Sequence, residues 1–348
     1  MQRVTFTLRT LTPLFLAGAD QTSAELRAPT FRGLMRYWQR ALVGGIVGTD
    51  AAGLKTVIEQ EKSVFGATDS GSAVNIQVPP IASHEPKEFT EPISRRIGNR
   101  WQATGKGYLL WSMAKSGRIE KGNFEPAHWY FPPGSDFQIT LSSRDQNNMQ
   151  LKQAIADLWL LTQLGAIGSR SRRGAGSVQV IETTLTDQVQ ISGISFQTAN
   201  SIDNLQKQIE NGLKAARNLY TSDLSEVQIN TARFDILAPR TCRIWLLQED
   251  RPWPNSEAAM QDLGKKLQDY RNQIPIEQRK IFGLPLLPII HNKRRSSPLL
   301  LHIAKLQEDQ YIAIAILFKT TGKGIKIEDY KLIEDWIDRF PGRLEVTL

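Results

Sequence analysis

Residues 165–176 read Gly-Ala-Ile-Gly-Ser-Arg-Ser-Arg-Arg-Gly-Ala-Gly and separate a helical pattern over 149–164 from a strand-like pattern over 178–181. Glycines permit unusual backbone angles and a close approach to a ligand, and arginines supply forked donors for phosphate oxygens. A Walker loop would open a helix with Gly-Lys-Ser/Thr, so this run does not indicate a nucleotide-hydrolysing P-loop. The alternative is a flexible helix-to-strand turn. The candidate RNA-binding residues of this Gly-rich loop are Gly168, Arg170, Arg172, Arg173, Gly174 and Gly176.

The elements around the Gly-rich loop follow a regular order. Hydrophobic periodicity predicts strands over 4–8, 74–78, 136–141 and 178–181 and helices over 30–42 and 149–164. The resulting β-α-β-β-α-β order is the ferredoxin-like (RRM-like) plan, interrupted here by insertions. Within the insertions, residues 52–63 read as a helix and residues 108–113 as another strand. We therefore predict an α+β fold for the first half.

A shorter version of the same order recurs in the second half. The patterns predict strands over 231–237, 243–247, 299–303, 311–318 and 343–348, and helices over 205–220, 257–270 and 329–340. A chain of 348 residues also exceeds the usual size of one domain. We expect two ferredoxin-like domains with a boundary between residues 187 and 200, so that the domains span 1–190 and 191–348.

The helix predicted over 30–42 separates packing from charge. At 100° per residue, Trp38 falls on an apolar face, whereas Arg32, Arg36 and Arg40 form a ridge at i, i+4 and i+8. An exposed helix usually pairs such charges with acids four residues away, and none is present here. The ridge therefore predicts contact with phosphates or with a partner subunit, the alternative being a solvated helix face. Gly44-Gly45 are expected to end this helix.

The charge of the chain is large and unevenly distributed. A net charge of +8 indicates a polyanionic partner, and the windows 26–49, 92–119 and 158–181 contain no acid. The window 92–119 reads largely as a loop in which basic and aromatic residues are interleaved. Such a loop suits contact with phosphates and stacking on nucleobases. Tyr108 and Trp111 could instead face the core. The candidates from this window are Arg95, Arg96, Arg100, Trp101 and Lys106, with Trp101 as the stacking residue.

Signals for catalysis, metal binding and membranes are weak. Cys242 is the only cysteine, and the four histidines lack metal-ligand spacing, so we expect no metal and no cofactor. His84 and His128 lie in predicted loops, where a lone histidine is more often structural than catalytic. The first ten residues lack the apolar core of a signal peptide, and the longest apolar run is too short to span a bilayer. We expect a soluble, cytoplasmic protein without catalytic residues.

Two segments resemble a known family. Thr12-Pro-Leu-Phe15 with Gly18, followed by the stretch from Arg27 to Arg40, is similar to the opening of RAMP proteins of type III-B CRISPR (Cmr) complexes. The run from 165 to 177 resembles that family's G-rich loop, and Gln39 departs from it where the family often has a second Trp. The resemblance implies tandem ferredoxin-like domains in a crRNA-guided, RNA-targeting assembly. It carries RNA contact onto the arginines of the helix and the loop: Arg32, Arg36, Arg40, Arg170, Arg172 and Arg173.

The resemblance also implies a place and partners. It predicts a non-catalytic subunit that contacts crRNA, through its 3′ part, or target RNA, alongside other Cmr RAMP subunits. Two alternatives stay open at this point. A metal-independent RAMP endonuclease that processes CRISPR precursor RNA would need His84 or His128 near the Gly-rich loop. A protein scaffold would touch RNA only through its neighbours.

Overall fold

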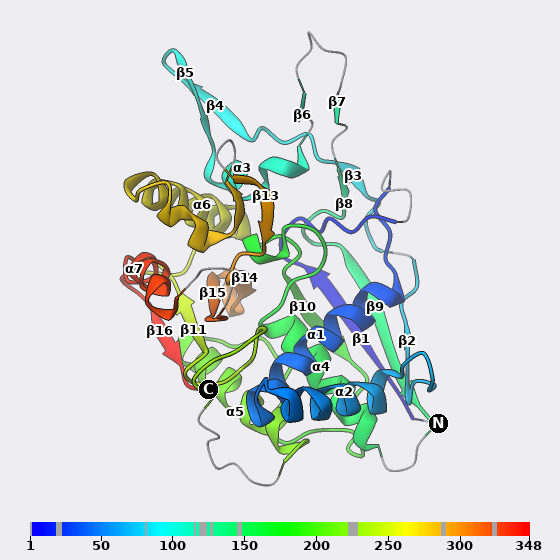
Figure 1. Cartoon of the computed structure of the whole chain (residues 1–348). Coiled ribbons are helices and arrows are strands. Elements are labelled where there is room, and N and C mark those ends of the chain that lie inside the picture. The colour runs from blue at the N-terminus through cyan, green and yellow to red at the C-terminus, as the bar shows by residue number, and fades with distance from the viewer. Residues whose placement is uncertain are drawn as a thin grey trace.

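The first half of the chain builds a four-stranded antiparallel sheet. The computed structural model of the protein describes residues 2–18, 23–80, 82–114, 116–117, 124–125, 128–144, 148–221, 229–286, 290–321 and 326–348. The strands lie in the order β10 (Val178–Thr183), β1 (Gln2–Thr10), β9 (Asp136–Ser143) and β2 (Val74–Gln77). Helices α1 (Ala28–Val47), α2 (Ala51–Phe65) and α4 (Met149–Gln163) lie on one side of this sheet (Figure 1). Alternate residues of β1 are buried beneath them, as the period-2 pattern predicts.

The second half repeats this arrangement with shorter connections. Its sheet has the order β14 (Leu299–Lys305), β15 (Tyr311–Phe318), β11 (Cys242–Leu247) and β16 (Leu344–Val346), again antiparallel. Helix α6 (Ser256–Gln273) follows β11, and the 3₁₀ turn η6 (Ile327–Tyr330) and α7 (Lys331–Ile337) precede β16. When the strands are counted within each half, both sheets run fourth, first, third, second. A mixed α+β fold with antiparallel sheets is confirmed.

The two halves of the chain pack against each other. The second sheet buries both faces: Ile244 and Ile314 join the core of the first half, whereas Trp245 and Ala315 pack with α6 and α7. This explains why β15 is apolar throughout rather than alternating. Helix α5 (Ile202–Asn218) contacts α1, α4 and β16 and so bridges the halves. The division into domains 1–190 and 191–348 stays a prediction.

The insertion between β2 and β9 differs from its expected form. Residues 108–113 are helical, as α3 (Gly105–Leu110) and the 3₁₀ turn η1 (Trp111–Met113), and not a strand. The Thr104 hydroxyl accepts a hydrogen bond from the Gly107 N–H and caps α3. Apolar residues of the turn then pack against α6, which a period-2 strand could not achieve. The other elements are β3 (Lys87–Glu88), β4 (Ser94–Ile97), β5 (Arg100–Ala103), β6 (Ser116–Gly117), β7 (Phe124–Glu125) and β8 (Trp129–Tyr130).

Close contact between glycines fixes this insertion to the second half. A Cβ on Gly105 would lie 1.7 Å from the Gln261 carbonyl oxygen, and one on Gly264 would lie 1.9 Å from the Gly105 carbonyl oxygen. Only glycine allows α3 and α6 to cross at this distance. Beyond that crossing, the β4–β5 hairpin, which we call the arm, extends away from the body of the molecule (Figure 1).

Two further expectations were wrong. Helix α1 continues through Gly44-Gly45, because these glycines admit a neighbouring segment: a Cβ on Gly45 would lie 2.1 Å from the Leu237 carbonyl oxygen. That segment, residues 231–237, forms no regular strand; it makes one isolated bridge, from Ala232 to Thr320, and runs along α1. The remaining elements are the turns η3 (Ser171–Arg173), η4 (Gln278–Phe282) and η5 (Gln307–Asp309) and the strands β12 (Leu284–Leu286) and β13 (Ile290–Arg295). Within the described ranges, no helix combines the length and apolar composition that crossing a bilayer requires.

Candidate nucleic-acid interface

The Gly-rich loop connects α4 to β10 and packs tightly against its own chain. Gly168 and Gly176 have φ of +85° and +70°, and a Cβ on them would lie 2.1 Å from the Phe15 carbonyl oxygen and 1.8 Å from that of Ile167. Their close approach is therefore to backbone. Gly174 also has a positive φ, +83°, but a Cβ added there would lie 3.8 Å from its nearest neighbour, Cγ1 of Ile303. Glycine at 174 is required by the backbone angle and not by crowding.

The three arginines of the loop reach three separate parts of the chain. Arg170 donates to the Leu109 carbonyl of the insertion (2.7 Å), and Arg173 donates to the Phe282 carbonyl of the second half (2.9 Å). Arg172 donates to the Ser297 carbonyl (2.8 Å) and forms an ion pair with Asp235. Burial opposes its charge, but Tyr37 and Asp235 raise the pKa of Arg172. The loop is thus the junction of the first sheet, the insertion and the second half.

A cavity of about 730 Å³ opens at this junction, and we call it the basic pocket. Tyr108, Trp111, Phe282 and Ser297 line it together with arginines from the Gly-rich loop, α6, η4 and β13. No Asp or Glu is present among the described residues that line it. Its six arginines are Arg170, Arg172, Arg173, Arg271, Arg279 and Arg295.

Several donors in the basic pocket are buried without an acceptor. In the part of the chain that the structure describes, Arg173 Nη1, Arg271 Nε, Arg295 Nη1 and the Ser297 hydroxyl have no hydrogen-bond partner. Burial, together with neighbouring Arg170 and Arg271, lowers the pKa of Arg173 to about 9. Buried polar groups are normally satisfied, and an unpaired buried cation is costly. Anions with several acceptor oxygens are the natural partners of such donors, and phosphate has this chemistry.

A second cavity, of about 410 Å³, adjoins the basic pocket, and we call it the side pocket. The two share four lining residues: Arg172, Arg295, Ser296 and Ser297. The side pocket adds apolar and aromatic surface from Tyr37, Leu54, Phe234 and Pro298, and two more arginines, Arg40 and Arg233. The two pockets therefore adjoin at these residues, and arginines outnumber acids among the described residues of both.

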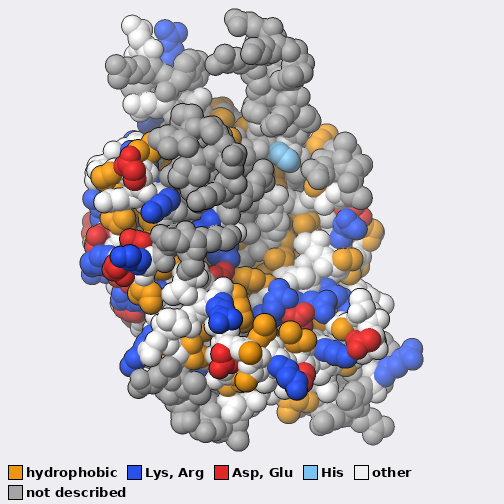
Figure 2. Space-filling model, in the orientation of Figure 1, with side chains coloured by type: hydrophobic (Ala, Val, Ile, Leu, Met, Phe, Trp, Pro, Cys, Tyr) orange, Lys and Arg blue, Asp and Glu red, His pale blue; other side chains and the backbone are white. Residues whose placement is uncertain are grey.

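The arginine ridge of α1 faces α2. Arg32 donates to the Phe65 carbonyl (3.0 Å), Arg36 donates to the Gly66 carbonyl (2.7 Å), and Glu61 forms ion pairs with Arg36 and Arg40, each at 2.8 Å. The next helix thus supplies the acid that α1 itself lacks. Around α2, basic and acidic side chains are interspersed on the molecular surface (Figure 2). Of the three arginines, Arg40 also lines the side pocket. RNA contact by Arg32 and Arg36 stays a prediction.

The structure places the five candidate residues of the insertion in different environments. Arg95 and Arg96 are exposed on β4 of the arm, and Arg100 and Trp101 pair with that strand through the backbone of β5. The side chains of Arg100 and Trp101 lie outside the described part of the structure. Lys106 is buried, and its ammonium pairs with Glu91 and Glu257, so its charge is balanced within the chain. RNA contact by all five residues stays a prediction.

Histidines are absent from both pockets among the described lining residues. His84 is exposed beside the Ser83 hydroxyl (3.1 Å), and His128 belongs to the insertion, where its carbonyl accepts from Phe89. Within the described ranges, no three His, Cys, Asp or Glu residues gather as a metal site. His302, which the sequence did not single out, lies behind the Gly-rich loop with Nδ1 2.6 Å from the Gly165 carbonyl oxygen. Burial lowers the pKa of His302 to about 4, so neutral Nδ1–H donates this bond.

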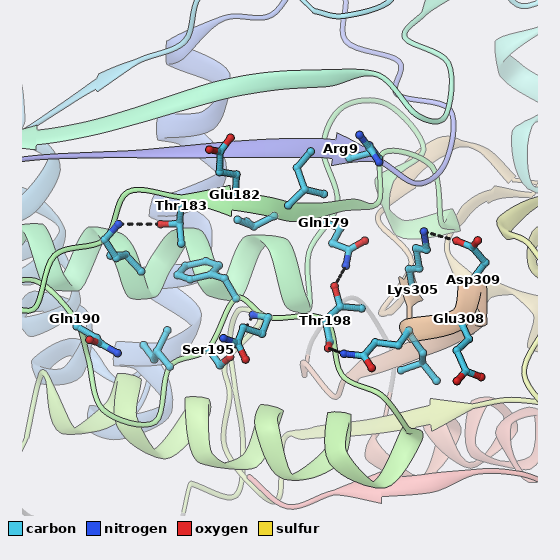
Figure 3. Close-up of a pocket in the computed structure, with 18 residues that line it drawn as sticks. Arg9, Gln179, Glu182, Thr183, Gln190, Ser195, Thr198, Lys305, Glu308 and Asp309 are labelled. Atoms are coloured by element: carbon cyan, nitrogen blue, oxygen red, sulfur yellow. Dashed lines mark hydrogen bonds and ion pairs between the residues drawn. The ribbon is translucent and has the colours of Figure 1, made fainter.

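A larger cavity, of about 870 Å³, has a different character (Figure 3). It lies along β10, the edge strand of the first sheet, and residues 194–198 and 305–309 also line it. Both signs of charge line it, and Lys305 pairs with Asp309 (2.5 Å) while Gln179 bonds Thr198. A polyanion gains little from a cavity whose cations are already paired. The smaller basic pocket is therefore the better candidate for binding nucleic acid.

Comparison with known proteins identifies the family of this chain. A model of the RAMP superfamily matches residues 7–179, which contain α1 and the Gly-rich loop. The chain is 28% identical to the CRISPR system Cmr subunit Cmr1-1 of Pyrococcus furiosus over 331 residues, 93% of this chain and 90% of that protein. It is 33% identical to Cmr1-2 of the same organism over 192 residues, 52% of this chain and 96% of that protein. The chain belongs to the RAMP superfamily and, within it, to the family of these Cmr1 subunits.

Solved structures show the same fold. The crystal structure of apo Cmr1 from Pyrococcus furiosus matches with a TM-score of 0.67 and 23% identity, over 99% of this chain and 98% of that chain. A chain in the cryo-EM structure of the type III-B Cmr-beta complex, bound to cognate target RNA and AMPPnP in the presence of ssDNA, matches with a TM-score of 0.61 and 14% identity. That match covers 96% of this chain and 98% of the other. At these identities the likeness concerns the fold alone.

Proposed function

We propose that the protein is a non-catalytic, RNA-binding subunit of a cytoplasmic, crRNA-guided type III-B (Cmr) RNA-targeting complex. The observation that carries the proposal is the basic pocket, where six arginines meet without a lining acid among the described residues and four buried donors lack acceptors. Membership of the Cmr1 family supports the assembly, and the fold likeness to a chain of a target-RNA-bound Cmr-beta complex supports RNA as the partner. In this proposal the two sheets are tandem ferredoxin-like units, and other Cmr RAMP subunits and crRNA or target RNA are the partners.

The basic pocket would bind the sugar-phosphate backbone. Arginines position a strand through its phosphates, which carry no sequence information, so this contact tolerates any sequence. Trp111 is 53% exposed at the pocket and, with Tyr108, offers aromatic surface to an unpaired base. These two aromatics replace Trp101 as the stacking residues that we favour. The 3′ part of the crRNA is the segment we assign to this site, on the strength of the family resemblance.

The endonuclease alternative requires a histidine beside the bound phosphate. Neither His84 nor His128 is among the described residues of the two pockets, so no observation favours cleavage at this site.

The proposal is tested by titrating the purified chain with fluorescent single-stranded RNA at several salt concentrations. Each phosphate neutralised on a single strand contributes roughly −0.7 to the log–log salt slope, and we expect a slope steeper than about −1.5. A shallower slope would mean that the pocket arginines do not engage RNA together. The same RNA, incubated without metal, should stay intact. Products that disappear on His84→Ala or His128→Ala would establish the endonuclease instead.

A further inference from the structure

The side pocket combines cations with a rigidly held aromatic ring. Phe234 is half-buried and belongs to the irregular segment that runs along α1. A Cβ on Gly44 would lie 3.1 Å from Cε2 of Phe234, so glycine at 44 provides the space in which the ring is seated. The backbone of this segment is fixed by a hydrogen bond from the Leu237 N–H to the Ala41 carbonyl (2.8 Å). A ring held in this way loses little freedom when a ligand packs on it.

The polar groups beneath the side pocket are paired with one another. The Tyr37 hydroxyl donates to Asp235 Oδ2 (2.8 Å), and the same carboxylate pairs with Arg172. The Arg172 guanidinium also lies 5.9 Å from the centre of the Tyr37 ring. The carboxylate therefore attracts no additional cation strongly, and what the pocket offers a ligand is apolar surface beside Arg40 and Arg233.

We propose that the side pocket binds an unpaired nucleobase of the RNA strand whose phosphates occupy the basic pocket. The inference rests on the proposed function and extends it from phosphate binding to base binding. The adjacency of the two pockets supports it, because Arg172, Arg295 and Ser297 line both and a base is covalently joined to the phosphate beside it. Charge supports it as well: Arg40 and Arg172 are paired with acids, but Arg233 and Arg295 line the pocket without an ion pair among the described residues. A volume of about 410 Å³ suits one base, and stacking on Phe234 accepts any base.

The experiment compares oligouridylate with an abasic sugar-phosphate oligomer of equal length and charge, using the full chain. The test variant is Phe234→Leu, which keeps apolar packing on Gly44 but removes the aromatic face. Stacking on one aromatic side chain contributes about five-fold or more to affinity. We expect Phe234→Leu to bind oligouridylate about five-fold more weakly and the abasic oligomer as wild type does. The control Trp129→Leu changes an exposed aromatic outside both pockets and should bind both oligomers as wild type does.

A second variant protects the test against misfolding. Leu54 is 43% exposed on α2, so Leu54→Gln removes apolar pocket surface at little risk to the fold. It should weaken oligouridylate binding about two-fold and leave abasic binding unchanged, and thermal melting of every variant verifies folding.

The outcomes separate this inference from the proposed function. If wild type binds both oligomers and folded Phe234→Leu and Leu54→Gln bind oligouridylate normally, the base site is wrong while RNA binding stands. The base site is also wrong if the variants weaken binding of both oligomers equally. That result would mean that the substitutions act indirectly on the arginines and that the natural occupant of the pocket is a protein side chain. If wild type binds neither oligomer, the proposed function fails and the base site with it.

Discussion

The arginine ridge of α1 and the basic pocket look alike in the sequence and differ in the structure. The ridge and the loop arginines of the pocket both lie in acid-free windows, yet the ridge finds acceptors in Glu61 and at the end of α2. In the pocket, a donor on Arg173 is unpaired in the described structure, as are donors on Arg271 and Arg295, which the fold brings in from other parts of the chain. Absence of acid nearby in the chain therefore does not mean absence of acid nearby in space. A cluster of buried donors for which the fold provides no acceptor is therefore a better sign of a binding surface than an acid-free window.

The largest effect that would follow from this difference is on RNA affinity. Arg271→Gln combined with Arg295→Gln removes two cations whose buried donors have no acceptor among the residues that the structure describes. Hydrogen bonds to charged groups contribute about 1.5–3 kcal/mol each, so affinity should fall on the order of 100-fold. The salt slope should become shallower by roughly 0.7 for each phosphate that the variant no longer neutralises. Fluorescence anisotropy at several salt concentrations measures both.

The matched control for the pocket is Arg339→Gln. Arg339 lies just after α7, donates to Gln273 Oε1 (2.9 Å) and lines neither pocket. Its affinity should stay within about two-fold of wild type, as expected for a single exposed charge. Equal losses in control and double variant would show that only the net charge matters and that the basic pocket has no special place.

The second effect is on stability and concerns His302. Like the ridge arginines, its donor has an acceptor within the chain, the Gly165 carbonyl. Its folded pKa of about 4 lies below the usual value near 6.5, so the unfolded state binds the proton more readily. Its contribution is complete above about pH 6.5 and is lost as the pH falls toward 4, which amounts to about 3 kcal/mol. His302→Gln keeps a donor for the Gly165 carbonyl but does not titrate. Urea unfolding from pH 7 to 4 should show a weaker pH dependence for this variant; parallel profiles would contradict the assignment.

The smallest effect is expected at the ridge. Arg36→Met keeps the aliphatic stem but loses the Gly66 carbonyl and Glu61, so the free energy of unfolding should fall by about 1–2 kcal/mol. RNA affinity should stay within about two-fold of wild type. Lys55→Met, on the exposed side of α2, is the control and should change stability by less than about 0.5 kcal/mol. If Arg36→Met unfolds as wild type does but no longer binds RNA, Arg36 contacts RNA as the sequence predicts.

Regular elements could be predicted from the sequence, and the site only in part. The periodicity of residues 30–42 correctly separates buried Trp38 from the ridge, and the Gly-rich loop does lie between α4 and β10. The run 108–113 was misassigned, because six largely apolar residues fit a strand as well as one helical turn packed on α6. Arg271 and Arg279 were missed because an acid lies two residues before each of them, and no acid lines the pocket among the described residues. Arg295, in the basic run 293–295, carried a signal that could have found it.

The crossing of Gly105 and Gly264 links the arm, which ends at Ala103, to α3 and α6, and residues of both helices line the basic pocket. Because neither position can accept a Cβ, α3 and α6 are held in register and cannot slide past one another. Tyr108 of α3 accepts a hydrogen bond from Arg271 of α6 (2.6 Å), and both residues line the pocket. The crossing that anchors the chain just after the arm therefore also fixes where Tyr108 and Arg271 lie in the pocket wall.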